Sequence, residues 1–155
     1  MTDADDKRDL VIARLIPAPP RAVYRAYTEP ALLKRWFAPK PYTVSEAELD
    51  VRPGGSQRIV MVGPDGTAMP LHGVYLEVVQ GARLVVTDAY LRAWEPAPKP
   101  FMTVVITFEA EGEGTRYTAR ARHWSEADRA AHEAMGFHQG WGLCADQLAE
   151  VAAAL

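Results

Sequence analysis

The sequence has 155 residues but only one cysteine, Cys144. A single thiol cannot form an intramolecular disulfide, and it cannot build a zinc site made of several cysteines. The chain also lacks any run of about 18 apolar residues, the length that a membrane-spanning helix needs. Its polar opening segment does not resemble a signal peptide. These absences predict a soluble, cytoplasmic protein.

The sequence has no excess of positive charge, since 17 Lys and Arg residues stand against 20 Asp and Glu residues. This balance argues against a dedicated nucleic-acid-binding protein. A glycine-rich loop followed by Lys-Ser or Lys-Thr is also missing, so nucleotide binding has no support. The four histidines, His72, His123, His132 and His138, lack the spacing of metal ligands. The sequence therefore predicts no metal site and indicates no cofactor.

The chain does contain enough apolar material for one folded domain. Hydrophobic residues make up 48% and charged residues 24% of the sequence, which is ordinary for a globular protein. A chain of this length can bury about 70% of its unfolded surface, so its core needs neither disulfides nor metals. We expect a flexible, charged tail over residues 1–9 and a single domain over residues 10–155.

Hydrophobic patterning predicts the order of the elements. The branched, apolar run over residues 10–16 indicates a first strand, and Pro20 and Pro30 then begin two short helices, the second over residues 30–37. Further strands are predicted at 42–51, 56–62, 68–79, 83–91, 101–111 and 115–124. The short breaks between most of these strands favour antiparallel hairpins. Residues 126–155 are expected to be helical with a break near Gly136, and Ser125 begins this segment.

Alternation in two strands separates an inner face from an outer face. In the strand over 101–111, one apolar face carries Met102, Val104, Ile106 and Phe108. In the next strand, one face carries Tyr117, Ala119, Ala121 and His123. The opposite face carries Arg116, Arg120 and Arg122, and we expect all three arginines to face water. His123 is therefore predicted to point inward.

Four short motifs occur in a fixed order along the chain. They are Pro30-x-x-Leu33-x-x-Trp36-Phe37-x-Pro39, Asp50-Val51-Arg52-Pro53-Gly54-Gly55, Asp65-Gly66 followed by Gly73-x-Tyr75-x-Glu77, and His138-x-Gly140-Trp141. As a set, over about residues 10–155, they resemble the bacterial single-domain branch of the activator of heat-shock protein 90 ATPase homologue family. That family lies within the START-like (SRPBCC) superfamily.

The resemblance implies an α+β, helix-grip fold. In this fold, a curved antiparallel sheet of about seven strands wraps around a long C-terminal helix, and two short helices follow the first strand. Family members enclose a hydrophobic cavity between the sheet and this helix. The resemblance therefore implies binding of small apolar molecules.

Inward alternation and the resemblance together predict the lining of a ligand cavity. The predicted lining residues are Trp36, Val86, Asp88, Met102, Val104, Ile106, Phe108, Tyr117, His123, Phe137, Trp141 and Cys144. Glycines at 136, 140 and 142 are expected to leave room beside Trp141, and the proline-rich segment 92–100 is expected to form part of the mouth. The first interpretation is a non-catalytic protein that binds a small apolar or aromatic molecule.

The second interpretation is an enzyme of the cyclase, dehydratase or hydrolase type. Its candidate acid or base residues are His123, Asp88 and Tyr117. An inward-facing Asp88 near His123 or His72 would place an acid–base pair in an apolar pocket. In the alternative arrangement, Asp88 is exposed at the end of its strand and His123 is a hydrogen-bonded core residue. Of these two functions, the sequence favours binding.

The third interpretation is a stress-related, co-chaperone-like interaction with another protein. It would use the outer stripe of Arg116, Arg120 and Arg122. The family name suggests this role, but the sequence does not contain the separate N-terminal domain of the eukaryotic activators. The strand edges of the expected sheet are compatible with a homodimer.

Overall fold

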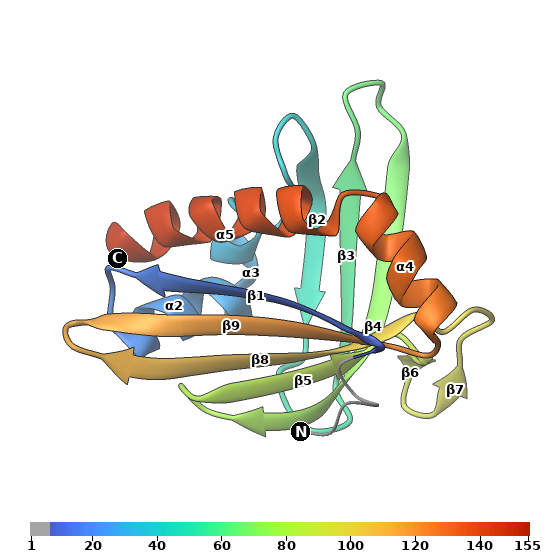
Figure 1. Ribbon diagram of the computed structural model, residues 1–155, viewed down its shortest axis with the longest axis horizontal. Helices are drawn as coiled ribbons and strands as arrows, with labels where there is room; N and C mark the ends of the chain where they lie inside the picture. Colours follow the sequence, from blue (N-terminus) through green and yellow to red (C-terminus); the bar gives the residue numbers. More distant parts are fainter. Residues whose placement is uncertain (1–6) are drawn as a thin grey trace.

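The computed structural model describes residues 7–155, which form a seven-stranded sheet with helices packed on one face (Figure 1). The strands of this sheet are β1 (Asp9–Ile16), β2 (Thr43–Leu49), β3 (Ser56–Val62), β4 (Ala68–Val79), β5 (Arg83–Thr87), β8 (Met102–Glu111) and β9 (Gly114–His123). A separate two-stranded hairpin consists of β6 (Tyr90–Arg92) and β7 (Glu95–Pro96). The helices are α2 (Pro20–Thr28), α3 (Pro30–Leu33), α4 (Glu126–Ala134) and α5 (Phe137–Ala153). Residues 1–6 of the predicted tail lie outside the described residues.

The strands of the large sheet are arranged in the order β1-β9-β8-β5-β4-β3-β2, and all neighbouring pairs are antiparallel. The sheet bends so strongly that β2, β3 and β4 run across the direction of β1, β8 and β9 (Figure 1). The long helix α5 lies along the inner face of this bend, where it packs against α2 and β1. This arrangement confirms the predicted α+β fold with a curved sheet around the C-terminal helix.

The break between the last two helices is confirmed at Gly136. This residue has a φ of 96°, in the left-handed region that glycine adopts without a steric penalty. The preceding helix α4 begins as predicted, because Ser125 Oγ accepts a hydrogen bond from the backbone N–H of Asp128 at 3.0 Å. The two helices therefore meet at an angle that a continuous helix would not allow.

Two predicted elements end earlier than expected. The predicted strand over 83–91 divides into β5 and β6, because the side chain of Asp88 takes over hydrogen bonds from the backbone of Phe101 and Met102. The second short helix, predicted over 30–37, is α-helical only to Leu33. The chain leaves the helix there, and the indole N–H of Trp36 then donates to the backbone carbonyl of Ala26 at 2.9 Å.

The inner face of β8 and β9 is buried as predicted, and it includes Ile106, Phe108, Tyr117 and His123. The expectation for the outer arginines is wrong for Arg120. Its side chain is only 26% exposed, because it lies 2.9 Å from a carboxylate oxygen of the buried Asp9. A buried carboxylate needs such a partner to offset the loss of hydration.

Within residues 7–155, no helix combines the length and hydrophobicity required to cross a membrane.

Candidate functional site

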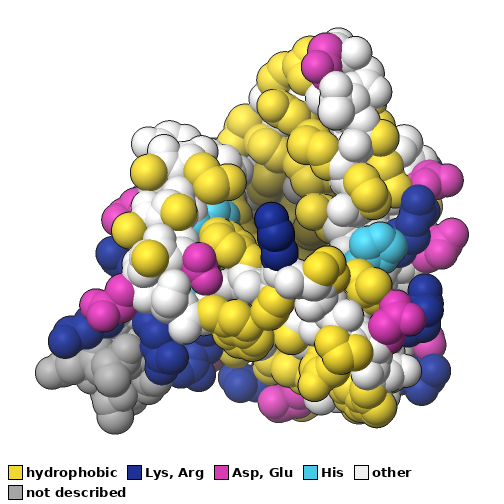
Figure 2. Space-filling view, turned by 90° about the vertical axis from the view of Figure 1, so that its right-hand side faces the viewer, with side chains coloured by type: hydrophobic (Ala, Val, Ile, Leu, Met, Phe, Trp, Pro, Cys, Tyr) yellow, Lys and Arg dark blue, Asp and Glu magenta, His cyan; other side chains and the backbone are white. Residues whose placement is uncertain are grey.

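A hollow lined mostly by hydrophobic side chains, with a Lys or Arg side chain at its edge, opens between the helices and the projecting β3–β4 part of the sheet (Figure 2). Ile59 of β3 is fully buried in the core, so it marks the inner face of this part of the sheet. Its direct cross-strand partner on β4 is Leu71, which therefore lies on the same face. Met61 and Met69 form the next pair on this face. Leu71 is 41% exposed although it faces the helix side, so the helices leave this part of the inner face uncovered.

The twelve residues predicted to line a cavity fall into two groups. Six are at most 4% exposed and belong to the packed core: Trp36, Ile106, Phe108, Tyr117, His123 and Phe137. The other six are half-buried: Val86, Asp88, Met102, Val104, Trp141 and Cys144. Val86 and Val104 are direct cross-strand partners, and Met102 and Trp141 pack on the cluster that contains Phe137. The predicted lining is therefore divided between the packed core and a partly exposed group.

Tyr117 and Cys144 are poorly suited to proton transfer or nucleophilic attack. The Tyr117 hydroxyl lies 2.7 Å from the Tyr27 hydroxyl, and burial raises the pKa of Tyr117 well above its usual value. Burial also raises the pKa of the Cys144 thiol to about 12, and this thiol donates to the carbonyl of Phe37 at 3.4 Å. Both groups stay protonated at neutral pH.

Asp88 directly follows the end of β5 and lies near His123, without a hydrogen bond between the two side chains. It is half-buried, and its Oδ1 accepts hydrogen bonds from the backbone N–H groups of Phe101 at 2.8 Å and Met102 at 3.1 Å. Burial raises its pKa, while these hydrogen bonds and the nearby His123 act in the opposite direction. No described residue forms a side-chain hydrogen bond to this carboxylate, and His72 is exposed on β4. Asp88 therefore serves to fix the start of β8.

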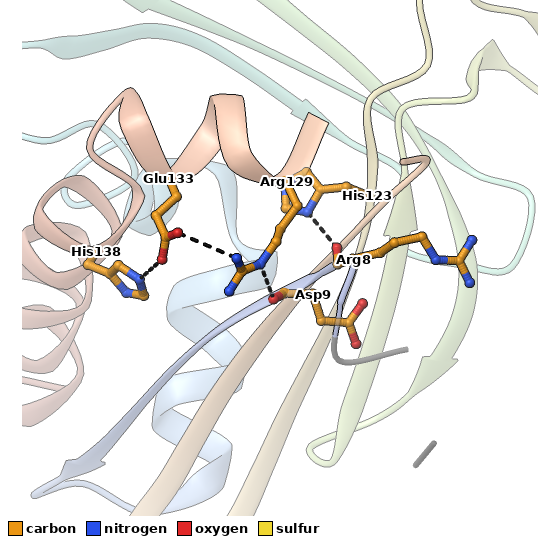
Figure 3. Close-up of polar contacts among 6 residues, drawn as sticks. All are labelled: Arg8, Asp9, His123, Arg129, Glu133 and His138. Carbon is orange, nitrogen blue, oxygen red and sulfur yellow. Dashed lines mark hydrogen bonds and ion pairs between the residues drawn. The ribbon is translucent and has the colours of Figure 1, made fainter. Parts of the chain in front are cut away.

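His123 is hydrogen-bonded at both ring nitrogens. Its Nδ1 lies 2.8 Å from the backbone carbonyl of Arg8, and its Nε2 lies 2.8 Å from Nδ1 of His132 (the contact to Arg8 is drawn in Figure 3). A carbonyl oxygen only accepts hydrogen bonds, so His123 Nδ1 carries a proton and, in the neutral ring, Nε2 accepts. His132 Nδ1 is then the donor, and the lone pair of the neutral His132 ring lies on Nε2.

Sequence reasoning missed His132 as a site residue. No motif marks it, and only the turn at Ser125, which directs α4 back over the sheet, brings it beside His123. Aromatic rings surround it, with ring centroids 5.2 Å away at Phe101, 5.1 Å at Phe137 and 5.9 Å at Trp141. Burial, together with the nearby His123, lowers the pKa of His132 to about 4.

Polar contacts of Arg129 and Glu133 hold α4 in position (Figure 3). Arg129 Nε donates to the backbone carbonyl of Asp9 at 3.1 Å, and its Nη1 lies 3.5 Å from Glu133. Glu133 in turn accepts a hydrogen bond from His138 on α5 at 3.0 Å. These contacts connect α4 to β1 and α5, and they fix the place of His132.

Gln147 is a second residue that sequence reasoning missed. Its Nε2 donates to the carbonyls of Trp36 and Ala38, both at 2.8 Å, and its Oε1 accepts from the backbone N–H of Lys40 at 3.2 Å. This buried amide joins α5 to the segment between α3 and β2. Only the folded arrangement, and no local pattern, brings these groups together.

The surroundings of the glycines on α5 differ from one position to the next. A Cβ at Gly142 would lie 3.0 Å from Arg14 on β1, so this glycine allows a close approach of α5 to the sheet. A Cβ at Gly140 would meet nothing within 4 Å. The segment 92–100 contains the end of the β6–β7 hairpin, where Trp94 stacks edge-on against Tyr90 at 5.4 Å.

Two further hollows have charged side chains in their lining. One, of about 260 Å³, is lined by Arg8, Asp9, Thr103, Arg122, His123 and Trp124. The other, of about 240 Å³, is lined by Glu48, Leu49, Asp50, Ser56 and Arg58. In the described part of the chain, no three His, Cys, Asp or Glu side chains come together as metal ligands.

The model of the family described as activator of Hsp90 ATPase homolog 1-like protein matches residues 17–153. The chain belongs to this family. Proteins with curated descriptions include none that is significantly similar to it. Membership confirms both the resemblance carried by the four motifs and the helix-grip fold.

Solved structures agree with this assignment to the activator of Hsp90 ATPase homolog 1-like family. A protein from Nitrosomonas europaea is 44% identical, with a TM-score of 0.92 and coverage of 95% of each chain. A protein from Chromobacterium violaceum is 26% identical, with a TM-score of 0.76 over 94% of this chain and 96% of that one. An AHSA1-like protein from Aeromonas hydrophila, 20% identical with a TM-score of 0.73 over 94% of this chain and 92% of that one, supports the fold alone.

Proposed function

We propose that the protein binds a small apolar or aromatic molecule in the hollow between the inner face of the sheet and the helices α4 and α5. The observation that carries this proposal is the uncovered apolar face of β3 and β4, where Leu71 lies beside the Met61–Met69 pair (Figure 2). Exposed apolar surface of this kind costs free energy in water unless a ligand or partner covers it. A concave, mostly apolar surface is typical of small-molecule sites.

The chemistry of the candidate residues favours binding over catalysis. The Tyr117 hydroxyl and the Cys144 thiol remain protonated, and Asp88 is held by backbone N–H groups. No two of Asp88, Tyr117 and His123 share a hydrogen bond. An acid–base pair that acts on one substrate would require two such groups within reach of the same atoms.

The outer arginine stripe gives little support to a protein-docking function. Arg116 forms an ion pair with Glu111 at 2.9 Å, and Arg120 and Arg122 lie 2.9 Å and 3.6 Å from the carboxylate of Asp9. Cations that already neutralise carboxylates of the same chain gain less from an acidic partner.

Native mass spectrometry of the purified protein tests the proposal first. A co-purified adduct of a few hundred daltons that disappears on denaturation is the expected result. In parallel, binding of the neutral, apolar fluorophore N-phenyl-1-naphthylamine is compared between Leu71→Glu and the control Leu15→Glu. Leu15 is 60% exposed on the outer face of β1, opposite Arg116.

A charge at position 71 would lie on the inner apolar face, so it should weaken fluorophore binding by about tenfold, equivalent to about 1.4 kcal/mol. The Leu15→Glu variant should bind the fluorophore as the wild type does. A clean apo mass together with equal binding by both variants would refute the proposal.

A further inference from the structure

Among residues 7–155, one ring nitrogen on α4, Nε2 of His132, has no hydrogen-bond partner. The chain of hydrogen bonds from the Arg8 carbonyl through His123 to His132 leaves the lone pair of neutral His132 on Nε2. No donor among residues 7–155 reaches this atom. In the same residues, the buried side-chain atoms without a hydrogen bond are Asp9 Oδ1 and the Tyr75 hydroxyl. His132 Nε2 also lacks a hydrogen bond but is not one of these buried atoms, so it is accessible to solvent.

The surroundings of this nitrogen are apolar and aromatic. Phe101, Phe137 and Trp141 all have ring centroids within 6 Å of the imidazole, and Trp141 is itself half-buried. The space-filling view shows histidine surface on the helix side of the hollow, next to hydrophobic side chains (Figure 2). A ligand that reaches His132 would therefore find a fixed acceptor among aromatic side chains.

The acceptor is neutral at physiological pH, since the pKa of His132 is lowered to about 4. On the same helix, Arg129 bonds to the Asp9 carbonyl and Glu133 bonds to His138 (Figure 3). A neutral lone pair attracts an O–H or N–H group and repels an anion. These properties define the chemistry of the group that this position would accept.

We propose that His132 Nε2 is the polar recognition point for the ligand, and that the ligand is an aromatic or apolar molecule with a hydroxyl or N–H donor. This inference rests on the proposed function, which supplies the hollow and its apolar lining. The donor binds Nε2, and the ring of the ligand packs against Phe101 and Trp141. His123 acts as a positioning residue, because its Nε2 holds the proton of His132 on Nδ1.

The test uses three probes with the same two-ring body. 2-Naphthol carries a hydroxyl donor, 2-methoxynaphthalene has the same oxygen without a donor, and 2-naphthoate is an anion. Isothermal titration at pH 7.5 should show that 2-naphthol binds about threefold to tenfold more tightly than the ether, which is the contribution of one hydrogen bond. The anion should bind more weakly than the ether.

Variants then assign this preference to one atom. His132→Phe keeps an aromatic ring but removes the acceptor, so 2-naphthol and the ether should bind equally, and binding of the ether should be retained. His72→Phe is the matched control, because His72 is exposed on β4 and lies outside the contacts that hold His132 in place. The preference for 2-naphthol should be unchanged in this control.

A measurement on the wild type does not depend on the folding of a variant. ¹⁵N NMR of the histidine rings should show His132 Nε2 without a proton in the free protein, and its resonance should shift when 2-naphthol binds but not when the ether binds. Equal binding of all three probes would overturn the inference and leave the proposed function standing. Failure of all three to bind would overturn both.

Discussion

The Oδ1 atom of Asp88 connects the end of β5 to the start of β8, because it accepts hydrogen bonds from the backbone N–H groups of Phe101 and Met102.

Alternation along the sequence correctly placed Ile106 and Tyr117 on the inner face, since that pattern depends only on the pleat of the strands. The partners of Asp88 and His123 could not be predicted in the same way. They belong to a loop and a helix whose positions depend on the completed fold.

At this scale, we predict opposite outcomes for two substitutions of Asp88. Asp88→Ala leaves the N–H groups of Phe101 and Met102 without an acceptor, so it should lower the free energy of unfolding by about 1–3 kcal/mol. Asp88→Asn keeps an oxygen acceptor and removes a charge that burial disfavours, so its stability at pH 7 should equal or exceed that of the wild type.

Urea unfolding followed by tryptophan fluorescence measures both variants. Because burial raises the folded-state pKa of Asp88, the wild type becomes less stable as the pH rises through this pKa. Any advantage of Asp88→Asn should therefore shrink as the pH falls below that range. If Asp88→Asn is as unstable as Asp88→Ala at pH 7, the negative charge itself is required and the present explanation is wrong.

At the scale of elements, turn chemistry was the most reliable signal. Ser125 and Gly136 marked the ends of α4 from sequence, because a side-chain cap and a positive φ each demand a particular residue type. The boundary between β5 and β6 was not predictable. There a side chain replaces the backbone ladder, and the apolar pattern continues past the point where the pairing stops.

Two glycines near the start of α5 should respond in opposite ways to alanine. Gly140 is inside the helix with open space around its Cα, so Gly140→Ala should raise the free energy of unfolding by up to about 1 kcal/mol. Gly136 has a φ of 96°, so Gly136→Ala should lower it by about 1–2 kcal/mol. Thermal and urea denaturation of the pair measure both changes, and a similar shift for the two variants would argue against the break at Gly136.

At the scale of the whole molecule, the helix-grip architecture could be predicted because four motifs in order identify the family. The contacts that hold α5 in its place could not. Gln147 reaches backbone groups more than 100 residues earlier in the chain, at Trp36, Ala38 and Lys40. No local pattern distinguishes this residue from any other polar position on a helix.

We expect Gln147→Leu to lower the free energy of unfolding by about 2–4 kcal/mol, because two carbonyls and one N–H lose their buried partner. Asp146→Asn is a suitable control. Asp146 is the exposed neighbour, its contact with Arg14 spans 3.6 Å, and surface ion pairs of this kind contribute at most about 1 kcal/mol. Urea unfolding and hydrogen exchange at the Lys40 amide measure the effect, and equal stability of the two variants would show that the Gln147 contacts are dispensable.

The pairing of β1 with β9 also has a consequence for synthesis on the ribosome. Ile16 pairs with Thr115 and Asp9 pairs with Arg122, so each residue of β1 meets its partner only about 100 residues later. At a translation rate of about 5–20 residues per second, β1 waits roughly 5–20 s for β9 to be made. The nascent chain must therefore keep the apolar residues of β1 from pairing with other exposed strands until its last third has emerged.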